Sequence, residues 1–480
     1  MITPPAIISL VLFIFLHAAG AAPTTHLSNI TSSINATLQD QIVSQYTLVA
    51  AIDGKISRWV GAPNIRGTWD IVWTCFATIF VCTYTLLCLN LPAPSDSTLV
   101  LVRRRVLWMA LAIIGPEIVL SYAAGQWSRA KQAVKSFTTS GHKTFNMRLA
   151  FFADMGGFML HPKDHTTFDP FPLNAKQLHW LVIHGHVDYP DVDHLKEIWD
   201  KSKQDQLAKI ITAFQIGYFV LQCIGRAAQR LTITTLELNT LAIVVCSLMT
   251  SFTWQHKPSN VHTPIPLYTK ATIEVLNGTK PWRNTPLDFI DVNGPGWSMN
   301  VQPFMKMPVI PTQRPIQRIP NDRFPMNPYG VQEYCVCFAT LLFTGIHVAG
   351  CGFSFPTITE KIMWQTASWL LFAVTGIFWI FETMASWTRL GRWKWLYLWI
   401  TDRKKLPDFE AIKREEQQKR EASYEWTELP LPWEFWTIMP VAVVYGIARM
   451  YLIVEAFLEF RRVDAAAFLE VNWANFIPHI

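Results

Sequence analysis

The sequence has little charge. Asp, Glu, Lys and Arg make up 16% of its 480 residues, whereas a soluble domain carries about a quarter. Half of the residues are hydrophobic and 21 are tryptophan, which excludes intrinsic disorder and argues against a single soluble core. The excess of basic over acidic residues, 41 against 35, is too small to indicate a nucleic-acid partner. A multi-pass membrane protein, with the lipid bilayer as its partner, fits this composition.

Common cofactor and nucleophile motifs are also missing. The chain has no G-x-x-x-x-G-K-[ST] for a nucleoside triphosphate, no G-x-G-x-x-G for a dinucleotide and no G-x-S-x-G for a serine nucleophile. Paired aspartate-rich stretches that would hold magnesium and a diphosphate are absent too. We therefore predict no cofactor, and a reaction that begins by ionising a diphosphate is disfavoured.

The polar loops contain no cysteine, because all eight cysteines lie in or beside apolar stretches. We expect packing roles for them and no disulfides. The segment 125–206 is rich in histidine, but prolines 162, 170 and 172 break any helix that would align ligands there. A solvated loop is predicted in preference to a metal site. The histidines concerned are His161, His165, His179, His184, His186 and His194.

The N-terminal residues predict entry into the secretory pathway. An apolar run over 6–16 is too short to cross a bilayer and precedes small residues, so we predict a signal peptide over 1–21, with an uncleaved anchor as the alternative. The polar segment 22–70 contains the glycosylation acceptors Asn29 and Asn35, which favour the lumen. A multi-pass protein of the endoplasmic reticulum or secretory pathway is expected.

Long apolar stretches predict an all-α, polytopic membrane domain over 71–480. About seven spans are expected, with long polar loops on one face. A third acceptor, Asn277, lies between the fourth and fifth spans. The predicted spans are 71–91, 106–124, 207–225, 231–254, 334–353, 362–381 and 435–454.

The charges between these spans do not agree on one orientation. Arg103, Arg104 and Arg105 indicate that the first connection is cytoplasmic, in agreement with a luminal N-terminus. Seven spans then place the basic stretch 389–420 in the lumen, against the usual bias. Either one of the later helices is re-entrant or the orientation is inverted. The tryptophans of 393–399 suggest that part of this stretch lies at the membrane interface.

Three ionisable residues fall within the predicted spans. Glu117 follows a Gly-Pro pair in the middle of the second span, and Glu237 lies seven residues into the fourth. Arg449 lies in the seventh and cannot discharge, so we expect it to pair with a glutamate of another helix. The glutamate that it leaves unpaired would then be a neutral acid that can donate a proton. Glu117, Glu237 and Arg449 are the predicted catalytic residues.

A buried acid among aromatic side chains suits protonation of an alkene or epoxide and stabilisation of a carbocation. The leading hypothesis is therefore an enzyme that acts on a hydrophobic small molecule, namely a cyclase of a prenyl chain. A transporter, in which the same charges form a substrate or proton path, is one alternative. A non-catalytic membrane scaffold, in which they fix helix packing, is the other.

Several strings also resemble a known family. They lie at 66–75 (RGTWDIVWTC), 152–158 (FADMGGF), 200–205 (DKSKQD), 235–237 (TLE) and 476–479 (FIPH). From about residue 56 to the C-terminus the chain resembles a large, mostly uncharacterised fungal family of multi-pass membrane proteins. The resemblance implies a link to the integral membrane terpene cyclases of fungal meroterpenoid pathways. The compact seven-helix cyclases are much shorter than this chain, so none of their acidic residues can be transferred to it.

Overall fold

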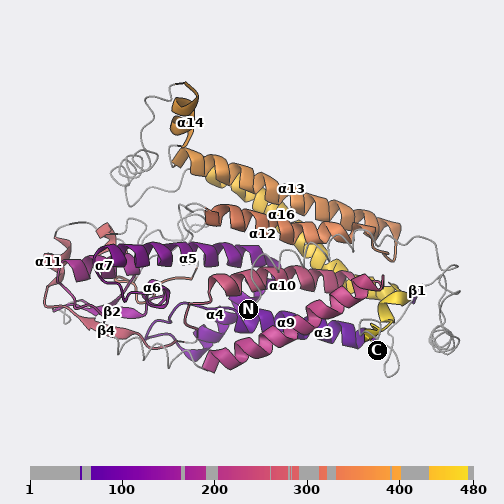
Figure 1. The fold of residues 1–480 in the computed structure, drawn as a ribbon, viewed down its shortest axis with the longest axis horizontal. Helices are drawn as coiled ribbons and strands as arrows, with labels where there is room; N and C mark the ends of the chain where they lie inside the picture. Colours follow the sequence, from indigo (N-terminus) through magenta and orange to yellow (C-terminus); the bar gives the residue numbers. More distant parts are fainter. Residues whose placement is uncertain are drawn as a thin grey trace, which may run out of the picture.

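The computed structural model describes residues 55–56, 66–163, 168–190, 204–259, 261–278, 280, 282, 284–290, 313–321, 331–389, 392–401 and 432–473. Within them, six long helices lie side by side along the long axis of the molecule (Figure 1). They are α3 (Thr68–Thr85), α9 (Gln204–Ala228), α10 (Thr235–Thr253), α12 (Val331–Ala349), α13 (Ile358–Arg389) and α16 (Pro432–Leu458).

The predicted membrane class is supported, whereas the count of seven spans is not confirmed. In the part of the chain that the structure describes, four stretches are long and apolar enough to cross a bilayer, or five if one bent pair of helices counts as a span. The apolar helix of 336–352 is shorter. The predicted signal peptide lies outside the described residues. The four stretches are Ile210–Ala228, Thr235–Thr253, Ile358–Phe381 and Met439–Arg461.

The predicted second span, 106–124, is wrong as a single helix. The chain forms α4 (Thr98–Ile114) and α5 (Pro116–Thr139), which meet at an angle of 111°. The break follows from the sequence, because a proline has no N–H to continue the helix and is favoured at the first position of a new one. Gly115 forms the joint, with φ −139° and ψ 71°. We call this joint the elbow.

Contacts between helix ends define the two ends of the bundle. Arg66, before α3, pairs with Glu237 at the start of α10, and Glu360 of α13 pairs with Arg461 after α16. These residues mark the turn end, where short connections join the helices. At the opposite end Arg105, in the middle of α4, donates to the carbonyl of Tyr84 near the end of α3.

The opposite end carries a small folded unit, which we call the lobe (Figure 1). It corrects two expectations, because the fold is not purely helical and the histidine-rich segment is not simply a solvated loop. Three short strands form a sheet in the order β3-β2-β4, and the lobe has its own apolar core, which includes Phe137, Phe152 and Phe158. Its elements are α6 (Met147–Asp154), β2 (Phe158–His161), β3 (Phe171–Leu173), α7 (Ala175–Ile183), β4 (Ile265–Tyr268) and α11 (Ile273–Asn277).

Short elements complete the described fold. The strands β1 (Lys55–Ile56) and β5 (Val463–Asp464) pair antiparallel at the turn end. Helix α14 (Arg392–Thr401) follows α13 and projects from the bundle on the side of the lobe (Figure 1). Single 3-10 turns lie at Asp288–Ile290, Gly350–Gly352, Glu459–Arg461 and Ala465–Phe468.

A buried lysine joins the lobe to the bundle. Lys257, just beyond α10, is 3% exposed. Its Nζ donates to the carbonyl of Cys88 (2.7 Å) and to the side-chain oxygens of Asn90 and Gln126 (2.9 Å each). All three acceptors are uncharged, and burial lowers the pKa of Lys257 to about 7. The junction between lobe and bundle therefore contains a group that titrates near neutral pH.

The lowered pKa of Lys257 predicts that the free energy of unfolding depends on pH. In the unfolded chain the pKa of a lysine is about 10.4, so between about pH 7 and pH 10 the unfolded chain binds more protons than the folded one. The free energy of unfolding should then rise with pH by up to about 1.4 kcal/mol per unit. Substitution of Lys257 by methionine should abolish this rise, whereas the same change at the exposed Lys270 should preserve it. Unfolding measured in detergent across this range tests the expectation, and an unchanged slope in Lys257→Met would contradict it.

Candidate functional site

The elbow leaves carbonyl groups of the last turn of α4 without a donor from the helix, because α4 ends at Ile114. Arg449 of α16 supplies the missing donors. Its Nε donates to the carbonyl of Ile114 (3.1 Å) and its Nη2 to that of Ile113 (3.2 Å). The guanidinium therefore caps the last turn of α4, where a cation also complements the helix dipole.

The remaining contacts of Arg449 bind it to two further helices. Nη1 donates to Oδ1 of Asn239 (2.8 Å) and to Nε2 of His347 (2.6 Å). Because an arginine only donates, Nε2 of His347 must accept, and its Nδ1–H donates to the carbonyl of Phe343 (3.0 Å). His347 is therefore neutral and serves as an interhelical acceptor. The Arg449 side chain is fully buried, 5.0 Å from the centre of the Phe343 ring.

This arrangement corrects the expected partner of Arg449. Within the described residues no ion pair joins Arg449 to a glutamate. Its charge is instead shared among uncharged oxygens and a neutral imidazole. Arginine suits this role because its planar fork presents five N–H groups in fixed directions.

Glu117 lies on the other side of the elbow, as the second residue of α5, and is 7% exposed. The hydroxyl of Tyr445 donates to its Oε1. Its Oε2 is buried and has no hydrogen-bond partner within the described residues. Tyr445 and Arg449 are four residues apart and so lie one above the other on α16. Helix α16 thus contacts both sides of the elbow. Tyr445 binds the carboxyl group of Glu117 on the α5 side, and Arg449 binds the carbonyls at the end of α4.

Glu237 has a different role. It is the third residue of α10, rather than the seventh of a span, and is 1% exposed. Its Oε1 pairs with Arg66, while its Oε2 accepts from the backbone N–H and the hydroxyl of Thr234 (3.0 Å each). Thr234 and Glu237 form a capping box, and the T-x-x-E spacing was a signal in the sequence that would have placed Glu237 at a helix start. Both of its oxygens are engaged, so of the two glutamates predicted from the sequence Glu117 is left as the candidate acid.

The pairing of Glu237 with Arg66 gives a prediction for stability. Substitution of Glu237 by glutamine leaves the Arg66 charge without its partner in a mostly buried position, and this should cost about 3 kcal/mol of unfolding free energy. A second substitution, Arg66→Met, should recover much of this loss. Unfolding by SDS in mixed micelles measures the cycle, with the exposed Glu470→Gln as the control. Simple additivity of the two single changes would contradict the coupling.

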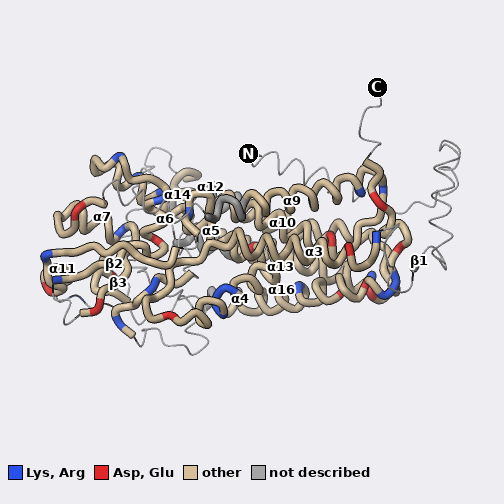
Figure 2. The backbone as a smooth tube through the Cα atoms, turned by 90° about the horizontal axis from the view of Figure 1, so that it is seen from below, with Lys and Arg blue, Asp and Glu red and all other residues tan. Residues whose placement is uncertain are grey.

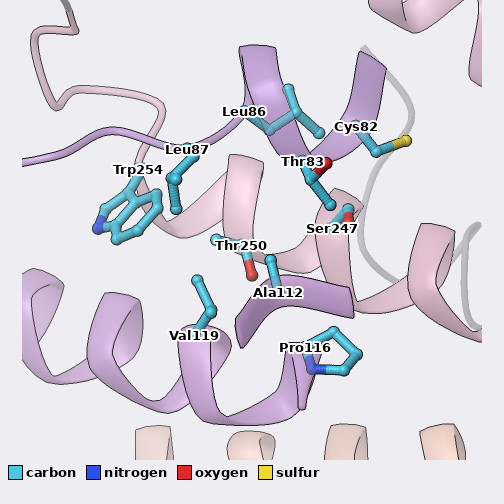
Figure 3. Close-up of a pocket in the computed structure, with 10 residues that line it drawn as sticks. All are labelled: Cys82, Thr83, Leu86, Leu87, Ala112, Pro116, Val119, Ser247, Thr250 and Trp254. Carbon is cyan, nitrogen blue, oxygen red and sulfur yellow. The ribbon is translucent and has the colours of Figure 1, made fainter. Parts of the chain in front are cut away.

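A small cavity lies beside the elbow (Figure 3). Its volume of about 20 Å³ is room for about one water molecule. Pro116 and Val119 line it from α5, but Glu117 is not among its lining residues. A prenyl chain is much larger than this space. The other lining residues are Cys82, Thr83, Leu86, Leu87, Ala112, Ser247, Thr250 and Trp254.

Several tryptophans near the helix ends point outward. Trp69, Trp73, Trp369 and Trp436 expose more than half of their surface, as expected of side chains that face lipid or its interface. Trp254, in contrast, is buried and donates to Oε1 of Gln126. The aromatic groups at the elbow itself come from other residues, Tyr445 and Phe343.

The histidines of the lobe are separate from the elbow. His161 packs on the ring of Tyr268, and His179 shares a hydrogen bond with Ser140 (3.0 Å). In the described part of the chain no group of three metal-ligating side chains converges. His165 and His194 lie outside that part.

The predicted glycosylation sites differ in what the structure describes. Asn29 and Asn35 lie outside the described residues. Asn277 ends α11 in the lobe, is 7% exposed and donates from Nδ2 to the carbonyl of Lys280 (2.8 Å). The amide nitrogen to which a glycan would be attached is therefore engaged within the fold.

Comparison with known proteins gives one family. A family of unknown function (DUF8562) matches residues 41–276 and 331–480, which is most of the chain. No curated protein and no solved structure matches it. The two matched stretches include the elbow, Asn239, His347 and the α16 residues that hold it.

Proposed function

We propose that this chain, which belongs to the family of unknown function DUF8562, is an integral membrane enzyme that uses Glu117 to protonate a hydrophobic substrate. The observation that carries the proposal is the state of its carboxyl group. Tyr445 fixes one oxygen, the other is buried without a hydrogen-bond partner in the described residues, and no ion pair within them neutralises the group. A carboxyl group in such surroundings is held most easily as the neutral acid.

In its specific form the proposed reaction is cyclisation of a prenyl chain in a fungal meroterpenoid pathway. The proton on Glu117 passes to a terminal alkene carbon or to an epoxide oxygen, and the next double bond attacks the resulting cation. Loss of a proton from carbon, back to the Glu117 carboxylate, ends the reaction and restores the acid. No oxidant, reductant or metal is needed. The supports are the buried acid, the missing diphosphate motifs and the family resemblance of the sequence.

The substrate must reach Glu117 by movement of the elbow, because the cavity beside it holds about one water molecule. Gly115 is the joint at which such movement can occur, since it has no side chain and links two helices that share no continuous hydrogen bonding. Arg449 and Tyr445 hold the closed arrangement. In this proposal they are positioning residues, and Glu117 alone exchanges a proton with the substrate.

A transporter is the second candidate, and the broken helix is the observation that favours it. Discontinuous helices within a membrane bundle form the binding sites of many transporters, where free helix ends meet the ligand. Here the free end of α4 is already occupied by Arg449, so transport would require that side chain to leave. This requirement makes the enzyme the preferred proposal.

Sealed microsomes with and without the wild-type protein separate the two functions. They are incubated with a linear prenylated phenol, and the products are analysed by mass spectrometry and NMR. The enzyme predicts a new cyclic compound of the same mass as the substrate, or of the epoxide when that is supplied. Accumulation of unchanged substrate within the vesicles would select the transporter, and neither effect would contradict both.

A further inference from the structure

The elbow determines on which side of the membrane each connection lies. The connection before α4 lies against the lobe, where the N–H of Leu91 donates to the carbonyl of Met155, and the middle of α4 lies beside the end of α3, where Arg105 contacts Tyr84. Helix α5 runs back into the lobe, where Phe137 near its end stacks on Phe145 with ring centres 3.8 Å apart. The α4–α5 pair therefore enters the bundle from the lobe end and returns to it. The pair therefore does not cross the membrane. Between the start of α3 and the lobe the chain crosses the membrane once, whereas seven spans would require two crossings.

The connections sort into two groups as a result. Before α3, between α9 and α10, between α12 and α13 and after α16 the chain is at the turn end, where the Arg66–Glu237 and Glu360–Arg461 pairs lie. The lobe and α14 both belong to the other end (Figure 1). The start of α3 is thus opposite to the long connections, whereas seven spans would have placed them together.

With this number of crossings, the two basic stretches of the sequence no longer indicate opposite orientations. Arg103, Arg104 and Arg105 lie in α4 where it meets the end of α3 at the lobe end, and α14 contains two basic residues and no acidic residue. Both stretches now lie at the same end. Charged residues gather toward the two ends of the molecule in Figure 2, but at the turn end Arg66 is paired with Glu237 and Arg226 is buried against backbone carbonyls. Basic residues that flank spans face the cytoplasm.

Asn277 agrees with this orientation. It belongs to the lobe, and the fold buries it and engages its amide nitrogen. An acceptor sequence in the cytoplasm meets no glycosylation machinery, so nothing prevents its burial there.

Helix α14 presents apolar side chains that are largely exposed within the part of the chain that the structure describes. Trp393, Tyr397 and Ile400 follow the spacing i, i+4, i+7 of one helical face and are 46%, 66% and 68% exposed. The helix follows directly on α13, which contains one of the four candidate spans. Tryptophan and tyrosine beside the end of a span are typical of the lipid headgroup layer. The two basic residues of α14, Arg392 and Lys394, complement anionic headgroups, which are concentrated in the cytoplasmic leaflet.

We propose that the lobe end faces the cytoplasm and that α14 binds the anionic lipid surface of the cytoplasmic leaflet. The apolar face of Trp393, Tyr397 and Ile400 enters the headgroup layer, and the basic residues around it contact phosphate and carboxylate groups of the lipids. This proposal does not depend on the chemistry assigned to Glu117.

Cysteine labelling in sealed microsomes, whose outer face is cytoplasmic, tests the orientation. Two exposed residues are replaced separately, Tyr268→Cys in the lobe and Glu470→Cys at the turn end. A membrane-impermeant maleimide should label Tyr268→Cys above the wild-type level in intact vesicles, and Glu470→Cys only after permeabilisation. The reverse pattern, or equal labelling of both in intact vesicles, overturns the proposed orientation.

Hydrogen exchange tests the lipid surface. The full-length protein is placed in nanodiscs of phosphatidylcholine alone or with 30% added phosphatidylserine, about the anionic share that gives a strongly negative surface. Amides of 392–401 should exchange at least about fivefold more slowly with phosphatidylserine, and Tyr397→Asp/Ile400→Asp should remove the difference. Val275→Asp, on the exposed face of α11, should leave it unchanged. Equal exchange in the two lipids overturns the binding of α14 to anionic headgroups.

Discussion

Replacement of Glu117 by glutamine is expected to lower the rate of product formation by a factor of about 100 to 10,000, the usual contribution of a general acid. Glutamine keeps the size of the side chain and its oxygen can still accept the hydrogen bond from Tyr445. The variant should therefore fold and reach the membrane in normal amounts. Initial rates in microsomes, divided by the amount of folded protein, measure the effect.

The control for this experiment is Glu274→Gln, which changes an exposed glutamate of the lobe and should keep full activity. Tyr445→Phe should have an intermediate effect, because it leaves the acid in place but removes the donor that orients it. Full activity of Glu117→Gln would end the assignment of this residue as the acid. Equal losses in Glu117→Gln and Glu274→Gln would point to an indirect effect on the membrane protein as a whole.

Replacement of Arg449 by methionine should cost at least about 3 kcal/mol of unfolding free energy, because several buried acceptors lose their donor and each costs about 1–3 kcal/mol when left unsatisfied. The change leaves the carbonyls of Ile113 and Ile114, the side-chain oxygen of Asn239 and Nε2 of His347 without their donor. Each such group is costly when buried. Most of the protein should then fail to accumulate in folded form.

Fluorescence-detected size exclusion after a temperature series measures this loss. Arg103→Met is the matched control, because Arg103 is an exposed arginine of α4, the helix that Arg449 caps. Arg449→Lys should rescue only part of the loss, since an ammonium group has three donors and cannot reproduce the planar fork. An unchanged melting profile for Arg449→Met would show that the elbow is stable without its cap.

The sequence predicts most of the long helices well. Runs of about 20 apolar residues are a strong signal, and helices lie over six of the seven predicted spans, with ends that differ by a few residues. The second span was the exception. Gly115-Pro116 indicated a weak point, but a proline within a membrane helix is commonly tolerated as a kink. The structure shows a bend of 111° there, which the contacts of Arg449 and Tyr445 hold from its two sides.

The residues of the candidate site were easier to predict from the sequence than the groups to which they hydrogen-bond. Glu117 and Arg449 stood out because ionisable residues are rare in spans, and both lie at the elbow. A carboxylate was the expected partner of Arg449, whereas its partners are backbone carbonyls, Asn239 and His347. Such acceptors carry no signature in a sequence. The lobe was missed for a similar reason, since strands of three or four residues that contain Pro172 and Pro266 look like loop.

The central claim is that Glu117 is an uncharged carboxylic acid inside the bundle. Infrared difference spectroscopy of the wild-type protein against Glu117→Gln at pH 7 tests it directly, because a protonated carboxyl group and a carboxylate absorb at well-separated frequencies. We expect Glu117→Gln to lose a carbonyl band of a protonated carboxylic acid. The same band should remain in Tyr445→Phe but at a shifted frequency. Loss of a carboxylate band instead would mean that Glu117 is ionised, and the proposed proton donor would not exist.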